Sequence, residues 1–352
     1  MSRIHAALRT QSDRLLEVLD EFDDFLIVMH DNPDPDAIAS GWGVWVLIQE
    51  VLDRPVRLVG GGSIVRAENR HLVELLEPPL ELVSDVQIGP RTGTILVDCG
   101  SEATNHLLTR KGLRPTAVID HHLRGRHGSG TSFEDIRPDV AASATLVASY
   151  LREQGIEPGA KLAVAMLYAM RTETMGAETH HSELDCSILP WLTERAEPSL
   201  LADIENAPLK IDYFGDLLLA LQSTFVYDDV AFCFLPRAEC AEIVGEVADL
   251  LIRGESINKV LCAAVVGSDI VLSARTERDA GNAATLLVNT VQGLGGAGGH
   301  PHRAGGKIPA VGNATRTEEL HDELRRRWLK ECGVTRKRGS RLIRRSEIME
   351  NL

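Results

Sequence analysis

The chain has few aromatic residues, no closely spaced cysteine pair and no long apolar run. Phe, Trp and Tyr make up 4% of its 352 residues, which argues against a base-stacking platform like that of single-strand-binding proteins. The six cysteines include no C-x-x-C pair, so neither a disulfide framework nor a zinc ribbon is indicated. Because a membrane-spanning run and a secretory signal are also lacking, we expect a cytoplasmic protein.

Basic charge is also scarce over most of the chain. Lys and Arg number 37 against 51 Asp and Glu, a net charge of −14, which excludes a uniformly cationic surface for nucleic acid. The balance reverses from His321 onward, where ten basic residues face five acidic ones. The first 320 residues therefore carry −19, which fits an enzyme that gathers carboxylates around metal ions. A basic run of this kind is either a solvated helix face or a contact for RNA, and we expect the residues after Gly333 to be a loose tail.

Length and periodicity predict an α/β protein of two domains. Short β-rich runs alternate with helical stretches in the first half, which is typical of a parallel sheet wrapped by helices. The expected strands there are 25–30, 55–59, 94–98 and 115–120. The expected helices are 37–52, 68–76, 102–111 with Ser101 as its cap, 143–154 and 161–171. After further helices over 184–222, a second α/β unit is expected with strands 225–234, 260–266 and 269–274, a helix over 283–291, a glycine-rich loop and a helix over 315–331.

Polar side chains collect where three of the predicted strands end. Ligands of an open parallel sheet bind beyond the carboxyl ends of its strands, so these residues share one rim. They are His30, Asp34 and Asp36 after the first strand, Asp98 after the third, and Asp120, His121 and His122 after the fourth. Any one aspartate there is more often a turn former or a helix cap than a ligand.

Together these carboxylates would repel one another unless cations neutralised them, so the cluster predicts metal. Aspartate and histidine without thiolate fit Mn²⁺, with Mg²⁺ as the alternative, better than a structural zinc. A pair of such ions can polarise a phosphoryl oxygen and hold a nucleophilic water. The sequence therefore predicts a divalent-metal site that could support phosphoryl chemistry. A dinucleotide cofactor is not supported, because Gly60-Gly61-Gly62 lacks the G-x-G-x-x-G spacing.

The order of these motifs resembles that of the DHH phosphoesterase superfamily, which includes RecJ exonucleases, oligoribonuclease/pAp phosphatases of the NrnA type, cyclic-di-AMP phosphodiesterases and family II inorganic pyrophosphatases. The resemblance rests on H-x-N-P-D-x-D at 30–36, on Asp98 and on D-H-H at 120–122. The glycine-rich segment 295–306, preceded by L-S-A-R at 272–275, resembles the C-terminal domain of the nuclease and phosphatase branches. The likeness covers about residues 20 to 310.

The resemblance implies a role for each residue of the rim. His30, Asp34 and Asp98 would hold one Mn²⁺, and Asp36, Asp98 and His121 the second. Asp120 would orient a histidine, and His122 would face the scissile phosphate. In the family, a T-D-T-G-like aspartate completes the second site. Here Glu173 stands in its place, longer by one methylene, which puts occupancy of that site in question.

The resemblance also implies a division of the chain. The expected parts are a metal-binding catalytic DHH domain at 1–190, a helical linker at 191–224, a smaller substrate-binding domain at 225–332 and a basic tail at 333–352. The active site would be the cleft between the domains, and the second domain would grip the far part of a nucleotide. The residues expected to bind substrate there are Arg275, Gly298, Gly299 and His300. On its residues alone, the glycine-rich segment fits a sharply turning surface loop as well as an anion site.

We therefore expect an enzyme that hydrolyses short oligonucleotides (nanoRNA, from the 3′ end), 3′-phosphoadenosine 5′-phosphate or linear dinucleotides. Two alternatives stay open: an inorganic pyrophosphatase or polyphosphatase, and a nucleotide-binding sensor with weakened catalysis. The expected partners are short nucleotides, with no membrane and no long duplex. A homodimer is compatible with the resemblance.

Overall fold

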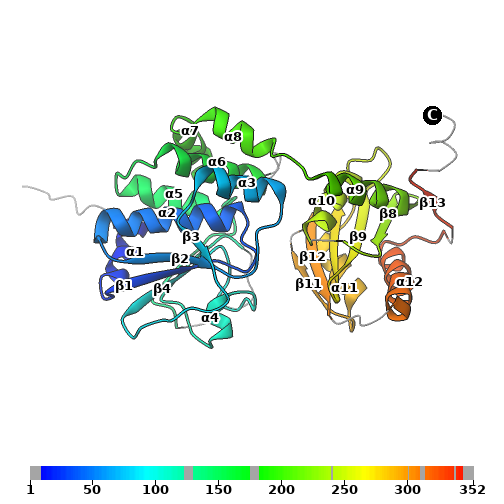
Figure 1. The fold of residues 1–352 in the computed structure, drawn as a ribbon, viewed down its shortest axis with the longest axis horizontal. Coiled ribbons are helices and arrows are strands. Elements are labelled where there is room, and N and C mark those ends of the chain that lie inside the picture. The colour runs from blue at the N-terminus through cyan, green and yellow to red at the C-terminus, as the bar shows by residue number, and fades with distance from the viewer. Residues whose placement is uncertain are drawn as a thin grey trace, which may run out of the picture. The chain divides into compact units, whose positions relative to one another are not determined.

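The computed structural model describes residues 9–122, 130–174, 182–238, 241–299, 301–309, 314–336 and 338–343. These residues form two compact units, Met1–Pro208 and Leu209–Leu352 (Figure 1). Both are α/β units, as the sequence predicts. None of the described helices is long and apolar enough to cross a membrane.

The first unit is built on a six-stranded sheet in which all neighbouring strands run parallel. Its strand order is β3-β2-β1-β4-β5-β6, so the direction of winding reverses between β1 and β4. Such a reversal is where open parallel sheets bind their ligands. The strands are β1 (Asp24–Val28), β2 (Val56–Gly60), β3 (Leu80–Leu82), β4 (Thr92–Val97), β5 (Ala117–Asp120) and β6 (Phe133–Ile136).

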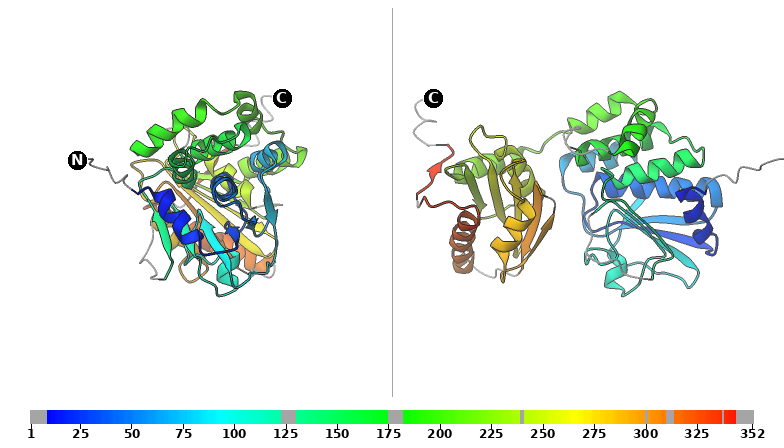
Figure 2. Two further views of the ribbon diagram at one scale, coloured as in Figure 1. Left: turned by 90° about the vertical axis from the view of Figure 1, so that its left-hand side faces the viewer. Right: turned by 180° about the vertical axis from the view of Figure 1, so that it is seen from behind.

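Most helices of this unit cover one face of the sheet, and α4 lies on the other (Figures 1 and 2). Helix α2 packs tightly against α5 and α6. The absence of a side chain at Gly43 permits this, since a Cβ there would lie 2.5 Å from Val147 and 2.4 Å from Met166. The helices are α1 (Gln11–Leu19), α2 (Pro35–Leu52), α3 (Ala67–Leu76), α4 (Leu107–Arg110), α5 (Ser143–Glu153), α6 (Ala160–Glu173), α7 (Glu183–Thr193) and α8 (Pro198–Glu205).

The second unit has a seven-stranded mixed sheet in the order β11-β12-β10-β9-β8-β7-β13. Only β8 and β9 are parallel among its described neighbours. Side chains of α11 and α12 join the core on one face, and those of α9 and α10 on the other. The elements are α9 (Ile211–Ser223), β7 (Phe225–Tyr227), β8 (Val230–Leu235), α10 (Glu242–Leu251), β9 (Lys259–Val266), β10 (Asp269–Thr276), α11 (Ala283–Val291), β11 (Gly296–Gly299), β12 (Arg303–Ile308), α12 (Ala314–Glu331) and β13 (Ser340–Arg341).

Two expectations about strands of this second unit were wrong. The strand expected over 225–234 is a hairpin of β7 and β8, which turns at Asp228 with φ +55°. The glycine-rich stretch contains β11 and β12, paired antiparallel, rather than only a loop. Propensity disfavours glycine in strands, but neighbouring backbone leaves no room for a side chain here. A Cβ at Gly299 (φ +142°) would lie 2.5 Å from the carbonyl oxygen of Arg303.

The residues after Gly333 are not wholly loose, because β13 adds to the sheet edge beside β7. The helix expected over 102–111 is shortened to α4, with His106 rather than Ser101 as its N-cap. His106 makes an isolated β-bridge with His30, and this long-range contact replaces the first turns of the expected helix. Strands β3 and β6 and helices α1 and α10 were not predicted; the two strands are short, which gives a weak periodic signal.

Candidate metal centre

The strand-end residues meet at one rim of the first sheet, on both sides of the winding reversal. His30 and Asp98 each come within two residues of the ends of β1 and β4, which pair along their length. Asp120 ends β5, the next strand across. Asp34 is the N-cap of α2, and its Oδ1 accepts hydrogen bonds from two backbone amides of that helix. Asp34 therefore both caps α2 and lies on the rim.

Three of these side chains form a first candidate group. The Nε2 atom of His30 lies 3.8 Å from Asp34 Oδ1 and 3.7 Å from Asp98 Oδ2. Both distances exceed a hydrogen bond, so the three groups face a shared space rather than satisfy one another. Their ligand atoms all lie within 4.8 Å of one another, close enough to hold one ion.

A second group lies on the other side of Asp98. Nε2 of His121 is 3.6 Å from Asp36 Oδ2 and 3.6 Å from Asp98 Oδ1, and Nδ1 of His122 is 3.9 Å from the same Asp98 oxygen. Asp98, His121 and His122 form the second set of potential ligands. Asp98 therefore directs one oxygen to each group, the arrangement that a bridging carboxylate needs.

The start of α5 donates hydrogen bonds to two buried carboxylates of the site, Asp36 and Asp98. The backbone amides of Ser143 and Ala144 donate to Asp36 at 2.7 and 2.8 Å, and the Ser143 hydroxyl donates to Asp98 Oδ1 at 2.9 Å. These amides are among those a helix N-terminus leaves unpaired, and the helix dipole favours negative charge there. Sequence reasoning missed Ser143, because its contacts join segments more than 40 residues apart; the small residues at 141, 142 and 144 are the only trace of such close packing.

The imidazoles are oriented through their other ring nitrogens. Nδ1 of His30 bonds the carbonyl oxygen of Asp31 at 2.9 Å, and Nδ1 of His121 lies 3.3 Å from that of Val140. These contacts place an Nδ1 proton on each ring and leave Nε2 directed at the carboxylates, as in many metal sites. Nδ1 of His122 bonds Asp120 at 2.8 Å, and Asp120 is fully buried whereas the His122 side chain is 41% exposed.

Asp98 also has an unusual backbone conformation, with φ +56°. This left-handed region costs most residues about 1–2 kcal/mol, and aspartate is among those that tolerate it best. Strained positions of this kind cluster at functional sites. Asn32, in the turn after His30, has the same φ, and its side chain accepts from the backbone of Ser63 at 2.9 Å.

Burial and mutual repulsion control the proton affinities of the rim. Burial raises the pKa of Asp98 well above its usual value, with a further contribution from Asp36, and burial also raises the pKa of Asp36. Burial opposes ionisation of Asp34 too, but His30 and backbone amides hold its pKa at about 2. Burial lowers the pKa of His30, yet the neighbouring carboxylates outweigh it and raise that pKa well above 6.5.

This donor set fits divalent cations. Two buried carboxylates beside imidazoles are expensive to ionise together unless positive charge lies between them. Oxygen and imidazole donors without thiolate suit Mn²⁺ or Mg²⁺ rather than a soft-metal site. The observation therefore supports a divalent-metal centre around Asp98.

The other expected site residues that the structure describes belong to neither of these two groups of potential ligands. Glu173 ends α6 and belongs to neither group of potential ligands found among the described residues. Arg275 lies on β10 of the second unit, where its guanidinium is paired with Asp249 at 2.6 and 3.3 Å. Gly298 and Gly299 lie exposed on β11. His300 lies outside the described residues.

Comparisons with known proteins match part of this chain to a protein family. Residues 24–170 match the sequence model of the DHH family, N-terminal domain. An uncharacterized protein of Methanocaldococcus jannaschii is 28% identical over 317 residues, which cover 88% of this chain and 64% of that protein. The chain thus spans less than two thirds of this relative's length.

Two solved structures share the fold over nearly the whole chain. An exopolyphosphatase-related protein from Bacteroides fragilis superimposes with a TM-score of 0.71 at 15% identity, covering 94% of this chain and 99% of its own. RecJ from Thermus thermophilus, solved with Mn²⁺, gives a TM-score of 0.54 at 15% identity and covers 92% of this chain and 54% of its own. At these identities the likeness shows the fold alone.

Proposed function

We propose that the chain is a metal-dependent hydrolase of the DHH superfamily and that it hydrolyses phosphoester bonds in short nucleotides; residues 24–170 match the DHH family, N-terminal domain. The observation that carries the proposal is the set of paired carboxylate and imidazole groups on either side of Asp98. A site with two clusters that share one buried carboxylate is suited to two adjacent divalent ions. We propose Mn²⁺ as the ion used.

In this proposal, His30, Asp34 and Asp98 hold the first ion, and Asp36, Asp98 and His121 hold the second. Glu173 remains the predicted further ligand of the second ion. When bound, the ions would polarise a phosphoryl oxygen and lower the pKa of a bound water.

His122 would act on the substrate rather than on the metal. Burial lowers its pKa, but the bond to Asp120 and nearby carboxylates raise it to about 9, so its ring is protonated at neutral pH. With Nδ1–H donated to Asp120, the Nε2–H remains to donate to a phosphoryl oxygen. Asp120 is thus a positioning residue, and His122 stabilises charge that develops in the transition state.

For substrate we propose nucleotides of one to a few units: nanoRNA, 3′-phosphoadenosine 5′-phosphate or linear dinucleotides. Arg275, Gly298, Gly299 and His300 of the second unit would bind the part remote from the scissile bond. In this proposal Arg275 gives up one of its hydrogen bonds to Asp249 and donates to a substrate phosphate instead. Both hydrogen bonds are charge-assisted.

The proposal is tested by hydrolysis of 3′-phosphoadenosine 5′-phosphate, RNA of two to five nucleotides and pyrophosphate, each with Mn²⁺, Mg²⁺ or EDTA. We expect metal-dependent turnover of a nucleotide that is lost in Asp98→Asn. Turnover of pyrophosphate alone would replace this proposal with a pyrophosphatase. Binding of Mn²⁺ and nucleotide without turnover of any substrate would favour a sensor. Metal stoichiometry of Glu173→Ala then tests the further ligand, with one ion expected instead of two.

A further inference from the structure

The second unit carries a concentration of positive charge that the metal centre does not use. Between residues 325 and 345 the sequence has ten basic residues and one acidic residue, in a chain whose net charge is −14. The structure describes residues 325–336 and 338–343 of this segment, which include the end of α12 and the strand β13. Like charges that are close in the sequence repel each other, and a polyanionic partner would neutralise them.

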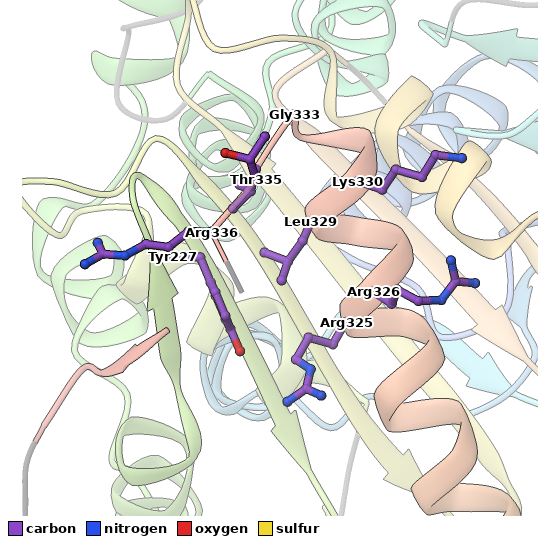
Figure 3. A pocket seen from close by; sticks show the side chains of 9 residues that line it. Tyr227, Arg325, Arg326, Leu329, Lys330, Gly333, Thr335 and Arg336 are labelled. Carbon is purple, nitrogen blue, oxygen red and sulfur yellow. The ribbon is translucent and has the colours of Figure 1, made fainter. Parts of the chain in front are cut away.

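This charge borders a groove of about 500 Å³ between α12 and β7. The nine lining residues include four basic side chains and no acidic one; the basic ones are Arg325, Arg326, Lys330 and Arg336. Figure 3 shows Arg325 and Leu329 extending from α12 toward Tyr227, whereas Arg326 and Lys330 extend from the other side of the helix and Arg336, beyond Tyr227, extends away from it. The groove is thus lined by apolar side chains and bordered by basic residues on both α12 and the chain that follows it.

The wall opposite α12 is fixed by the chain that follows this helix. Strand β13 pairs with β7, and the backbone amide of Leu342 donates to Thr224 at 2.9 Å. The Arg341 guanidinium lies 5.3 Å from the ring centroid of Phe225. A Cβ at Gly339 would lie 2.7 Å from the Tyr227 ring, so the chain passes directly over that ring. Arg336 is therefore positioned by folded structure on both sides of it.

The cations are available to a ligand. Arg325 pairs with Asp322 at 3.0 Å and Arg336 with Asp228 at 3.4 Å, both at the surface. Exposed pairs of this kind contribute about 0–1 kcal/mol, so a phosphate can displace the carboxylate. Lys330 has no ion-pair partner among the described residues. The negative end of the helix dipole accounts for a lysine in the last turn of α12, but not for arginines beyond the helix.

We propose that this groove binds the phosphate backbone of single-stranded nucleic acid, through Arg325, Lys330 and Arg336. The choice of nucleic acid rests on the proposed function, whereas the cationic groove does not. An anionic membrane is a poorer fit, because an interfacial helix needs an apolar face. The apolar side chains Leu320, Leu324 and Trp328 of α12 are at most 2% exposed and belong to the core.

The test is fluorescence anisotropy of labelled single-stranded RNA of 3 and 12 nucleotides, on the full chain in EDTA so that no hydrolysis occurs. The variant is Arg325→Gln/Lys330→Gln/Arg336→Gln. Its matched control, Arg237→Gln/Arg253→Gln/Arg316→Gln, removes three exposed cations from the same unit and gives the same net charge.

We expect the groove variant to bind the 12-mer at least roughly tenfold more weakly than wild type at low salt. The slope of log affinity against log salt should fall by about 2, since each phosphate contact on a single strand contributes about 0.7. The control variant should stay near wild type. Inorganic phosphate should compete poorly, since it makes only one such contact at a time.

Equal losses in the groove and control variants would overturn the proposal, because net charge alone would then explain binding. No loss in the groove variant would overturn it as well. Binding of phosphatidylglycerol vesicles in place of RNA, lost in the same variant, would assign the groove to membranes instead. Since the assay needs no metal, a groove variant that loses RNA binding supports this inference even if no nucleotide is ever hydrolysed.

Discussion

Replacement of Ser143 by alanine isolates one contact of the metal centre. The change removes the hydroxyl that donates to Asp98 at 2.9 Å but leaves the backbone amide that donates to Asp36. A hydrogen bond to a charged group contributes about 1.5–3 kcal/mol, which corresponds to roughly 10- to 150-fold in affinity. Mutations behind metal ligands typically cost about 10- to 100-fold, so the two estimates agree.

The measurement is calorimetric titration of the metal-free protein with Mn²⁺. We expect Ser143→Ala to bind at least roughly tenfold more weakly. Ser149→Ala is the matched control, since Ser149 is also buried on α5 but its hydroxyl donates to the carbonyl oxygen of Leu146 at 2.7 Å. The reasoning fails if Ser143→Ala binds Mn²⁺ within twofold of wild type, or if the control loses as much affinity.

Three further predictions concern other parts of the chain. Gly299→Ala should lower the free energy of unfolding by at least about 2 kcal/mol, whereas Gly298→Ala, with open space around its Cβ, should have little effect; chemical denaturation of both would show it. Burial lowers the pKa of His30, but neighbouring carboxylates outweigh it and raise that pKa, so protons compete with the metal for this ring. Mn²⁺ affinity should therefore rise with pH, with proton release detected by calorimetry in two buffers; a flat profile would contradict it. Asp120→Asn should lower the pKa of His122 from about 9, because the ring loses its carboxylate partner, and an NMR titration that shows no decrease would refute this pairing.

Local sequence patterns were sufficient to predict part of the site. Short apolar runs followed by acidic and imidazole side chains located β1, β4 and β5 and the residues at their ends. The parallel arrangement follows from alternation of strands and helices, and it brings those ends to one rim. This is why His30, Asp98 and His121 could be predicted as neighbours.

Contacts between segments that are far apart in the sequence could not be predicted and are seen only in the folded structure. Ser143 lies 107 residues from Asp36, and their contact depends on how α5 packs against α2. Antiparallel pairing with β12 makes a strand of a glycine-rich stretch whose composition predicts a loop. Strand β13 likewise forms only by pairing antiparallel with β7 at the edge of the sheet. Local propensity does not predict such partners, since each contact forms only when the rest of the sheet or core is in place.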